Sequence, residues 1–424
     1  MAAHPWEACI QWSKKYDSDI IHVNLAGTPV IVLSSLEATE ALLEKRSSIY
    51  SDRPTFPMVN DLMGWNFNLP FMKYGDEWYG GSTVVYLTNN STWSHPPVFP
   101  VYSARQPISL LRRLLSNPAG FRDHLKQMAG EVIISVTYGI DVQPVNDPYV
   151  ALAEEAIKSL SNARVPGRFI VDSIPILKYL PEWFPGAQFK RIAREGRSLS
   201  QAIRNVPFAE TKRRMASGEA TSCFTSKALR DLESGGKHFQ ESTVKNVAAA
   251  MYAAGAHTTV SALSTFILAM LANPDAQKNA QLEIDSVVGR GNLPDFSDKQ
   301  AMPYVAALIK ELMTSIAVIA YPLGPSSSDT YGPFFMMKLR ILIRMPSNPN
   351  ASSSTAKFTP GVRDPQSAFG ICPGRHMATE SIWIAVVSIL AMFDITKEIG
   401  EDGRPIEPSY KYEGGALLYE RSPI

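Results

Sequence analysis

A long apolar segment at residues 242–272 constrains this sequence more than any other feature. Alanine, valine, leucine and methionine occur on nearly all sides of a helix through it, and Ser242 is a plausible N-cap. Asn273-Pro274 stops the pattern, so the predicted helix is far longer than the average of about three turns. A helix that is apolar all round has to be covered by other elements, and we therefore expect it to be buried.

The rest of the chain also has mainly helical patterns. Residues 20–33 predict two short strands around a turn at Gly27-Thr28-Pro29. Asn273 is expected to cap a helix that has Pro274 at its first position and ends at Gly289. Further helices are predicted at 36–46, in two pieces over 108–140, and at 150–163, 189–217, 303–316 and 375–393. The sequence thus predicts a mainly α fold with a small β-region near the N-terminus.

Two segments lack such periodicity. Residues 79–104 contain Gly80-Gly81 and Asn89-Asn90-Ser91-Thr92, and residues 321–362 are rich in proline and serine. Structureless stretches of that length are unusual inside a compact domain. We therefore expect one domain over 1–424, in which 79–104 and 321–362 are aberrant and poorly ordered.

Charge and composition exclude several classes of protein. Lysine and arginine number 41 against 40 aspartate and glutamate, a net charge of +1 that gives no electrostatic case for a nucleic-acid partner. With 45% hydrophobic and 19% charged residues the composition is globular, which excludes a disordered, collagen-like or coiled-coil chain.

The cysteines and the apolar runs bear on the compartment. Cys9, Cys223 and Cys372 are too few and too scattered for a disulfide framework or the usual structural zinc site. They fit a reducing compartment, such as the cytosol or a cytosol-facing surface. No uninterrupted apolar run reaches the roughly eighteen residues that span a bilayer, and the N-terminus has no signal-peptide pattern. The sequence as written is expected to be soluble or peripheral.

The first candidate site surrounds Cys372, in the run Phe369-Gly370-Ile371-Cys372-Pro373-Gly374-Arg375-His376-Met377. A cysteine just before a helix start lies where backbone N–H groups and the helix dipole favour a thiolate. Gly374 lets a flat ligand approach the backbone closely, and a thiolate there could ligate a haem iron that activates dioxygen. The alternative is a small buried cysteine without a chemical role.

The second candidate site is Ala254-Gly255-Ala256-His257-Thr258-Thr259, in the middle of the long predicted helix. A mid-helix glycine is unfavourable relative to alanine, so Gly255 needs a reason. Small residues would open a groove, and Thr258 and Thr259 can bond to a carbonyl one turn earlier, producing a local widening that holds water. His257 and Thr258 could deliver protons beside a metal-bound oxygen. The alternative is a glycine needed for packing beside a surface histidine.

The order of these sites along the chain resembles the cytochrome P450 family of haem-thiolate monooxygenases. The resemblance rests on the 254–259 helix, a later helix with Lys310-Glu311, and Cys372-Pro373-Gly374 before the last helix. Four further segments are similar to basidiomycete members, fungal proteins often named after O-methylsterigmatocystin oxidoreductase: Tyr50-Ser51-Asp52-Arg53-Pro54, Tyr138-Gly139-Ile140-Asp141, Pro181-Glu182-Trp183-Phe184-Pro185-Gly186 and Asp295-Phe296-Ser297-Asp298. The similarity covers 1–78, 105–320 and 358–424.

The resemblance implies a cytochrome P450-like, all-helical fold and a haem b cofactor. By motif, Cys372 would be the axial iron ligand, in a loop with Phe369 and Gly374. Four residues would form the oxygen-binding groove and catalytic positions: Ala254, Gly255, His257 and Thr258. Glu311 would be the catalytic-set Glu of the Glu-x-x-Arg helix, and Trp78 would lie in the helix that holds a haem propionate.

The resemblance also implies partners. NADPH-cytochrome P450 reductase would supply electrons, O2 one oxygen atom, and a small hydrophobic molecule the substrate. Residues 55–72 and 160–180 would border the substrate pocket. The family implies a membrane surface at the cytosolic face of the endoplasmic reticulum, although the membrane anchor is absent from this sequence.

Two motifs depart from the family pattern. The family's haem loop reads Phe-x-x-Gly-x-Arg-x-Cys-x-Gly, whereas Phe369 precedes Cys372 by only three positions. Leu312-Met313-Thr314 follow Glu311, so the motif's arginine is absent and burial is expected to raise the pKa of the Glu311 carboxyl.

Two single positions depart as well. His257 stands where the family has an aspartate or glutamate, and Ser82 stands four positions after Trp78, where relatives carry a basic residue. These departures leave two alternatives to an active monooxygenase. One is a catalytically defective fragment or mis-spliced form of such an enzyme, and the other is a haem-free interaction protein that keeps the fold.

Overall fold

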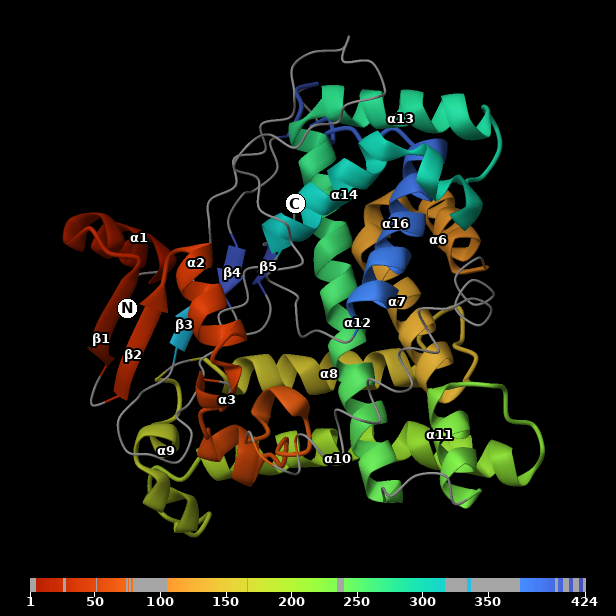
Figure 1. Ribbon diagram of the computed structural model, residues 1–424. Coiled ribbons are helices and arrows are strands. Elements are labelled where there is room, and N and C mark those ends of the chain that lie inside the picture. The colour runs from red at the N-terminus through yellow and green to blue at the C-terminus, as the bar shows by residue number, and fades with distance from the viewer. Residues whose placement is uncertain are drawn as a thin grey trace.

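The protein is described by a computed structural model over residues 5–25, 28–50, 52–73, 75, 78, 105–165, 167–234, 240–316, 334–336, 374–400, 403–406, 412–414 and 419–421. Helices make up most of the described chain, and a small β-region lies to one side of them (Figure 1). The prediction of a mainly α fold with a small β-region near the N-terminus is confirmed.

The β-region begins with the predicted hairpin. Strands β1 (Ile20–Leu25) and β2 (Thr28–Leu33) pair antiparallel, with Ile21 opposite Val32. Strand β3 (Phe334–Met336) joins β2 in parallel, and strands β4 (Tyr412–Gly414) and β5 (Tyr419–Arg421) form a second, two-stranded sheet. Helix α1 (Pro5–Tyr16) lies against the hairpin, where Cys9 and Trp12 pack on its buried valines.

Short helical segments follow the hairpin. They are α2 (Leu36–Thr39), η1 (Glu40–Glu44), α3 (Ser47–Tyr50), η2 (Pro57–Leu62) and η3 (Leu69–Phe71).

Apart from one helix over 224–233 that was not predicted, the long helices coincide with the predicted ones to within a few residues. They are α6 (Arg105–Ser116), α7 (Phe121–Tyr138), α8 (Pro148–Ala163), α10 (Phe189–Ala216), α11 (Phe224–Glu233), α12 (Glu241–Ala272), α13 (Pro274–Val288), α14 (Pro303–Ile316) and α16 (Arg375–Met392). Between them lie η5 (Pro118–Gly120), α9 (Ile170–Ser173), η6 (Pro175–Tyr179) and η7 (Phe296–Ala301).

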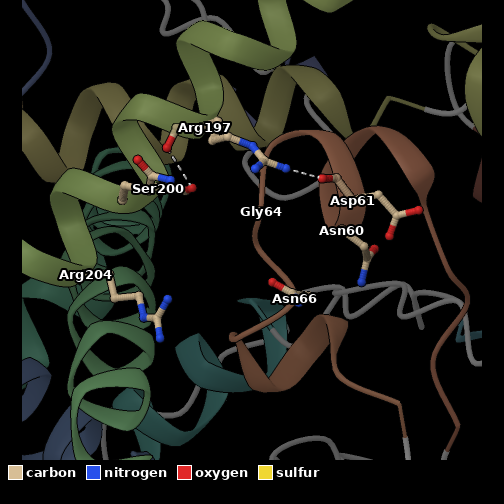
Figure 2. A pocket seen from close by; sticks show the side chains of 8 residues that line it. Asn60, Asp61, Gly64, Asn66, Arg197, Ser200 and Arg204 are labelled. Atoms are coloured by element: carbon tan, nitrogen blue, oxygen red, sulfur yellow. Dashed lines mark hydrogen bonds between the residues drawn. The ribbon is translucent and has the colours of Figure 1, made fainter. Parts of the chain in front are cut away.

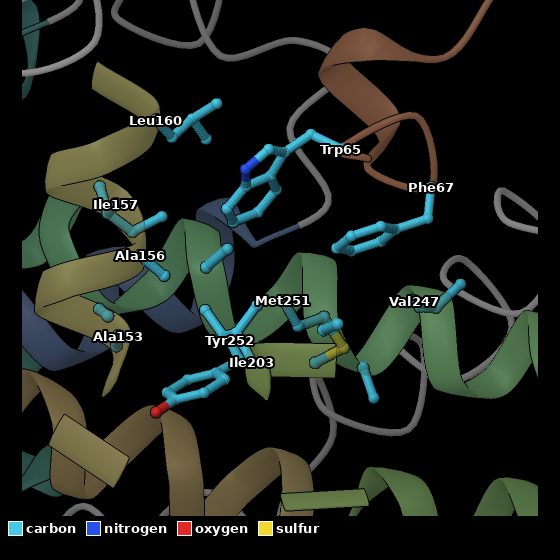
Figure 3. Packing of buried hydrophobic residues seen from close by; sticks show 14 of the residues in the cluster. Trp65, Phe67, Ala153, Ala156, Ile157, Leu160, Ile203, Val247, Met251 and Tyr252 are labelled. Carbon is cyan, nitrogen blue, oxygen red and sulfur yellow. The ribbon is translucent and has the colours of Figure 1, made fainter. Parts of the chain in front are cut away.

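Helix α12 runs through the centre of the helical part, with α7 and α16 beside it (Figure 1). Two buried clusters cover different lengths of it. The first contains Val244 to Ala256 of α12 and side chains from α7, α8, α10, α11 and the 57–71 segment (Figure 3). The second contains Ala262 to Met270 and side chains from α6, α13, α14 and α16. The prediction that this helix is buried is confirmed at both ends.

One predicted helix cap is wrong, and a second is right in position but not in its side-chain bond. Gln240, not Ser242, is the N-cap of α12, and the Ser242 hydroxyl instead lies 3.2 Å from Oε1 of Gln240. Asn273 is the N-cap residue of α13, but its side chain makes no cap bond there and donates instead to the carbonyl of Ala269, 2.9 Å away. Gly289 ends α13 with a φ of 82°, as predicted.

No uninterrupted apolar run of about eighteen residues occurs in the sequence, but one described helix meets a criterion of length and average composition. Helix α12 is long and apolar enough to cross a bilayer by length and composition alone. Half of its most apolar window is buried inside the protein, which is what a core helix requires.

Several predictions concern residues outside the described ranges. These are the whole of 79–104, nearly all of 321–362, and the candidate site residues Phe369 and Cys372. The single-domain prediction therefore stays a prediction.

Candidate functional site

The middle of α12 has one open side. Ala254 and Thr258 are exposed, whereas Ala253, Ala256 and Thr259 are buried. This open face falls between the two buried clusters, which contact the helix up to Ala256 and again from Ala262. The small side chain of Ala254 leaves the helix backbone accessible there.

Thr258 is held by its own helix. Its hydroxyl donates to the carbonyl of Ala254, 2.9 Å away, which is the bond predicted from the sequence. The backbone remains α-helical from Glu241 to Ala272, so the predicted local widening is wrong. The Thr258 oxygen keeps acceptor capacity on the open face, because its one proton is used in the bond to Ala254.

Gly255 has a packing function. A Cβ on this residue would lie 2.6 Å from both Cδ1 and Cγ1 of Ile133 on α7, closer than atoms of packed side chains approach. Glycine therefore allows α12 and α7 to approach closely, and this supports the packing alternative for Gly255.

His257 and Thr258 have different surroundings. His257 is only 7% exposed, whereas Thr258 is exposed. The histidine is therefore not the surface residue of the alternative interpretation, and it does not share the open face with Thr258.

The start of α16 lies beside the middle of α12 (Figure 1). Gly374 occupies the N-cap position and Arg375 begins the helix. Met377 packs against Val132 and Val136 of α7, which anchors the first turn of α16. Cys372, two residues before the N-cap, is outside the described residues.

A second contact holds α16. Lys299 of η7 pairs with Glu380, and the ring of Phe296 lies 5.7 Å from that of Trp383, centroid to centroid. These contacts fix the helix that follows the cysteine, and hence the backbone at Gly374.

Helix α14 carries Glu311. The Glu283 carboxylate of α13 accepts hydrogen bonds from the backbone N–H groups of Tyr304 and Val305, at 2.9 and 2.8 Å, and so satisfies the first turn of α14. Glu311 is partly buried, and burial raises the pKa of its carboxyl, as predicted. Trp78 is also partly buried, but most of the chain around it is outside the described ranges.

Comparison with known proteins decides the family. The family model for cytochrome P450 matches residues 1–320. A cytochrome P450 monooxygenase from Armillaria gallica is 38% identical, over 96% of this chain and 84% of the relative. A tryptamine 4-monooxygenase from Psilocybe cyanescens is 34% identical, over 95% of this chain and 84% of the relative.

The chain belongs to the cytochrome P450 family. A further relative, cytochrome P450 monooxygenase 98 from Postia placenta, is 37% identical over 98% of this chain and 84% of its own length. Membership identifies the chain as a monooxygenase-type oxidoreductase, and the family's cofactor is haem.

The described residues fit a haem of the P450 type. A flat macrocycle needs a helix face of small side chains and a backbone without a bulky side chain next to the iron ligand. Ala254 provides the first and Gly374 the second. The described residues contain no group of three or more histidine, cysteine, aspartate or glutamate side chains that could hold a metal ion.

The structure also contains a cavity along part of 55–72, one of the two segments expected to border the substrate pocket, and α10 was not predicted to form its other wall. It has a volume of about 290 Å3 and lies between η2, the loop that follows it, and α10 (Figure 2). Two arginines of α10, Arg197 and Arg204, border it at positions seven residues apart. This spacing places both arginines on one face of the helix, and it is the sequence signal that could have indicated the cavity. No motif accompanies it.

Proposed function

We propose that the chain is a haem-thiolate monooxygenase that inserts one oxygen atom from O2 into a hydrophobic organic substrate. The observation that carries this proposal is the open face at Ala254 and Thr258 in an otherwise buried helix, beside the start of the helix that follows Cys372. Haem b bound between them would supply the dioxygen chemistry, and the protein would orient the substrate and control protons.

The residues of the chain have separate parts in this proposal. Cys372 would be the iron's thiolate ligand, with Phe369 and Gly374 in the same loop. Thr258, fixed by its bond to the Ala254 carbonyl, would hold a proton-carrying water at the open face. His257 would act from its buried position behind that face.

Glu311 and Trp78 would act on the haem's surroundings. The raised pKa of the Glu311 carboxyl favours its protonated form, which can donate a hydrogen bond. Trp78 would lie at a propionate.

The partners of the proposed reaction are NADPH-cytochrome P450 reductase as electron donor, O2, and a small hydrophobic substrate; no nucleic acid takes part. We propose that the enzyme works at the cytosolic face of the endoplasmic reticulum membrane. Ile176, Tyr179 and Trp183, around η6, are 70%, 75% and 81% exposed. Aromatic residues such as Tyr179 and Trp183 favour the membrane–water interface.

Membrane binding can be tested by flotation with vesicles of phosphatidylcholine and phosphatidylserine. Replacing Ile176 and Trp183 by serine should reduce the bound fraction, because the apolar contact with lipid is lost. Leu115→Ser is the matched control, since Leu115 is 76% exposed but lies on α6. An equal loss in the control variant, or no loss in the double variant, would contradict the proposed surface.

The haem proposal is tested by spectroscopy of protein purified with added haem. The reduced carbon-monoxide complex should show the difference band typical of thiolate ligation, and Cys372→Ser should abolish it. Cys9→Ser is the control, because Cys9 lies on α1 against the hairpin. A protein that folds and binds no haem would contradict the proposal and support the haem-free alternative.

A further inference from the structure

The cavity between η2 and α10 is lined by none of the residues of the open face of α12. Four of its lining residues, Asp61, Asn66, Arg197 and Gln201, are exposed, so it opens to solvent. Phe67 does not line it, but lies behind Arg204 in the buried cluster around the first half of α12 (Figure 3). A ligand in this cavity would therefore come from solvent.

The walls of the cavity are tied together by hydrogen bonds. Arg197 donates from Nε to the carbonyl of Leu62, 2.8 Å away, and also to the carbonyl of Asp61. The Ser200 hydroxyl donates to the carbonyl of Met63 at 2.6 Å, and Gly64 turns the loop with a φ of 73°. These bonds hold the loop against α10, so the cavity is preformed and a ligand need not order it.

Of the two arginines that line the cavity, Arg204 is the one whose guanidinium is not bonded to the opposite wall. Its guanidinium lies 5.4 Å from the ring centroid of Phe67, and its Nε is buried without a hydrogen-bond partner among the described residues. Burial lowers the pKa of Arg204, which reflects the cost of keeping this cation partly out of water.

The other charges near Arg204 are occupied. The Asp61 carboxylate pairs with Lys178 at 2.6 Å, so it does not neutralise Arg204. Arg197 uses two of its donors on the backbone carbonyls of the opposite wall. Among the described residues that line the cavity, one guanidinium therefore remains free, and it suits a ligand with a single negative charge.

We propose that this cavity binds a small carboxylate. A carboxylate accepts two parallel N–H bonds from a guanidinium, and the fork of Arg204 is free to donate them. Asn66 reaches into the cavity from the opposite wall (Figure 2), and Gln201 lies one helical turn before Arg204.

The test is calorimetric titration of the full chain with sodium benzoate and, separately, with its neutral analogue benzamide. Benzoate should bind and benzamide should bind at least tenfold more weakly. Arg204→Gln should lower the benzoate affinity at least tenfold, because it removes the charge and the fork. The benzoate affinity of Arg204→Lys should lie between that of the unaltered chain and that of Arg204→Gln, since lysine keeps only the charge.

Three controls make the result specific. Arg191→Gln removes the same charge from the same helix at an exposed position and should leave benzoate binding unchanged. Thr258→Val should also leave it unchanged, which separates this cavity from the face of α12. Asn66→Ala, on the other wall, should weaken binding several-fold.

The proposal is overturned if benzoate binds Arg204→Gln as tightly as the unaltered chain, or if Arg191→Gln loses as much affinity. It is also overturned if benzamide binds as tightly as benzoate, or if Thr258→Val abolishes benzoate binding. None of these measurements depends on turnover, so they stand apart from the haem proposal.

Discussion

Gly255 on α12 packs directly against Ile133 on α7, where a Cβ on Gly255 would lie 2.6 Å from the Ile133 side chain. The contact sets how near the two helices pass, next to the open face at Ala254 and Thr258. The glycine therefore shapes the candidate site through packing and not through contact with a ligand.

Gly255→Ala should lower the free energy of unfolding by about 1–2 kcal/mol. Overpacking costs roughly 1–3 kcal/mol, and the better helix propensity of alanine returns up to about 1 kcal/mol. Ile133 is β-branched and its Cγ1 is as close as Cδ1, so rotation of the chain end does not relieve the clash. Urea unfolding followed by circular dichroism measures the change.

The same substitution in an Ile133→Ala background provides the control. Without the isoleucine the added methyl has room, so Gly255→Ala should there be neutral or stabilising, and the two effects should be non-additive. If Gly255→Ala stabilises the chain with Ile133 in place, the packing account is wrong.

Thr258 should matter for activity and little for stability. It is exposed and bonded only to its own helix at Ala254, so Thr258→Val should change the free energy of unfolding by no more than about 0.5 kcal/mol. If the proposed monooxygenase activity is correct, Thr258→Val should reduce product formation at least about tenfold by removing a proton-holding group. Product formation is measured with reductase, NADPH and a substrate that the unaltered chain converts.

Thr258→Ser is the matched variant, because it retains the hydroxyl and should keep most of the activity. The carbon-monoxide difference band should be unchanged in both variants. Equal activity of the valine and serine variants would argue against a proton-handling function for this hydroxyl.

Trp65 tests the contribution of aromatic packing in the first buried cluster. Its side chain is fully buried and stacks on Phe67 with ring centroids 5.6 Å apart (Figure 3). Its Nε1 has no hydrogen-bond partner among the described residues. Trp65→Phe should therefore cost less than about 1.5 kcal/mol, because no hydrogen bond is lost and an aromatic ring remains.

Trp65→Ala should cost about 3–5 kcal/mol, since it leaves a cavity beside Phe67. Comparing the thermal unfolding of the two variants separates the effect of lost side-chain volume from the effect of a lost hydrogen bond. A large loss in Trp65→Phe, comparable to that in Trp65→Ala, would mean that the indole N–H has a partner that stabilises the fold.

The helices were predictable from sequence because their signals are local. Apolar periodicity located α7, α10 and α12, and the bond from Thr258 to Ala254 follows from spacing within one helix. The N-cap at Ser242 was wrong, and Asn273 is the predicted N-cap of α13 but bonds Ala269 instead, because side chains near a helix end compete for the same backbone groups.

Features that depend on tertiary contacts were not predictable. The need for glycine at 255 comes from Ile133 on another helix, and nothing in the local pattern of α12 distinguishes that reason from a ligand groove. The cavity at Arg204 likewise requires the 57–66 segment to meet α10, a pairing that no periodicity encodes.

The last prediction concerns the pH dependence of stability through Glu210 on α10. Its carboxylate accepts hydrogen bonds from Arg213 at 2.9 Å and Arg214 at 2.8 Å, and these two guanidinium groups lower the pKa of Glu210 from 4.5 to about 2. Because the folded-state pKa is the lower one, the stabilisation is complete above pH 4.5 and is lost as the pH falls toward 2.

Glu210→Gln should accordingly lower the free energy of unfolding at pH 7 by about 0.5–1 kcal/mol, a modest amount because solvent screens the pair. The difference in the free energy of unfolding between the variant and the unaltered chain, measured by thermal unfolding, should be smaller at pH 4 and smaller still at pH 3. Glu195→Gln, at an exposed position of the same helix 3.9 Å from Arg191, should show a much smaller difference at pH 7. A Glu210→Gln difference that stays constant from pH 7 to pH 3 would show that the carboxylate's charge is not what stabilises this part of α10.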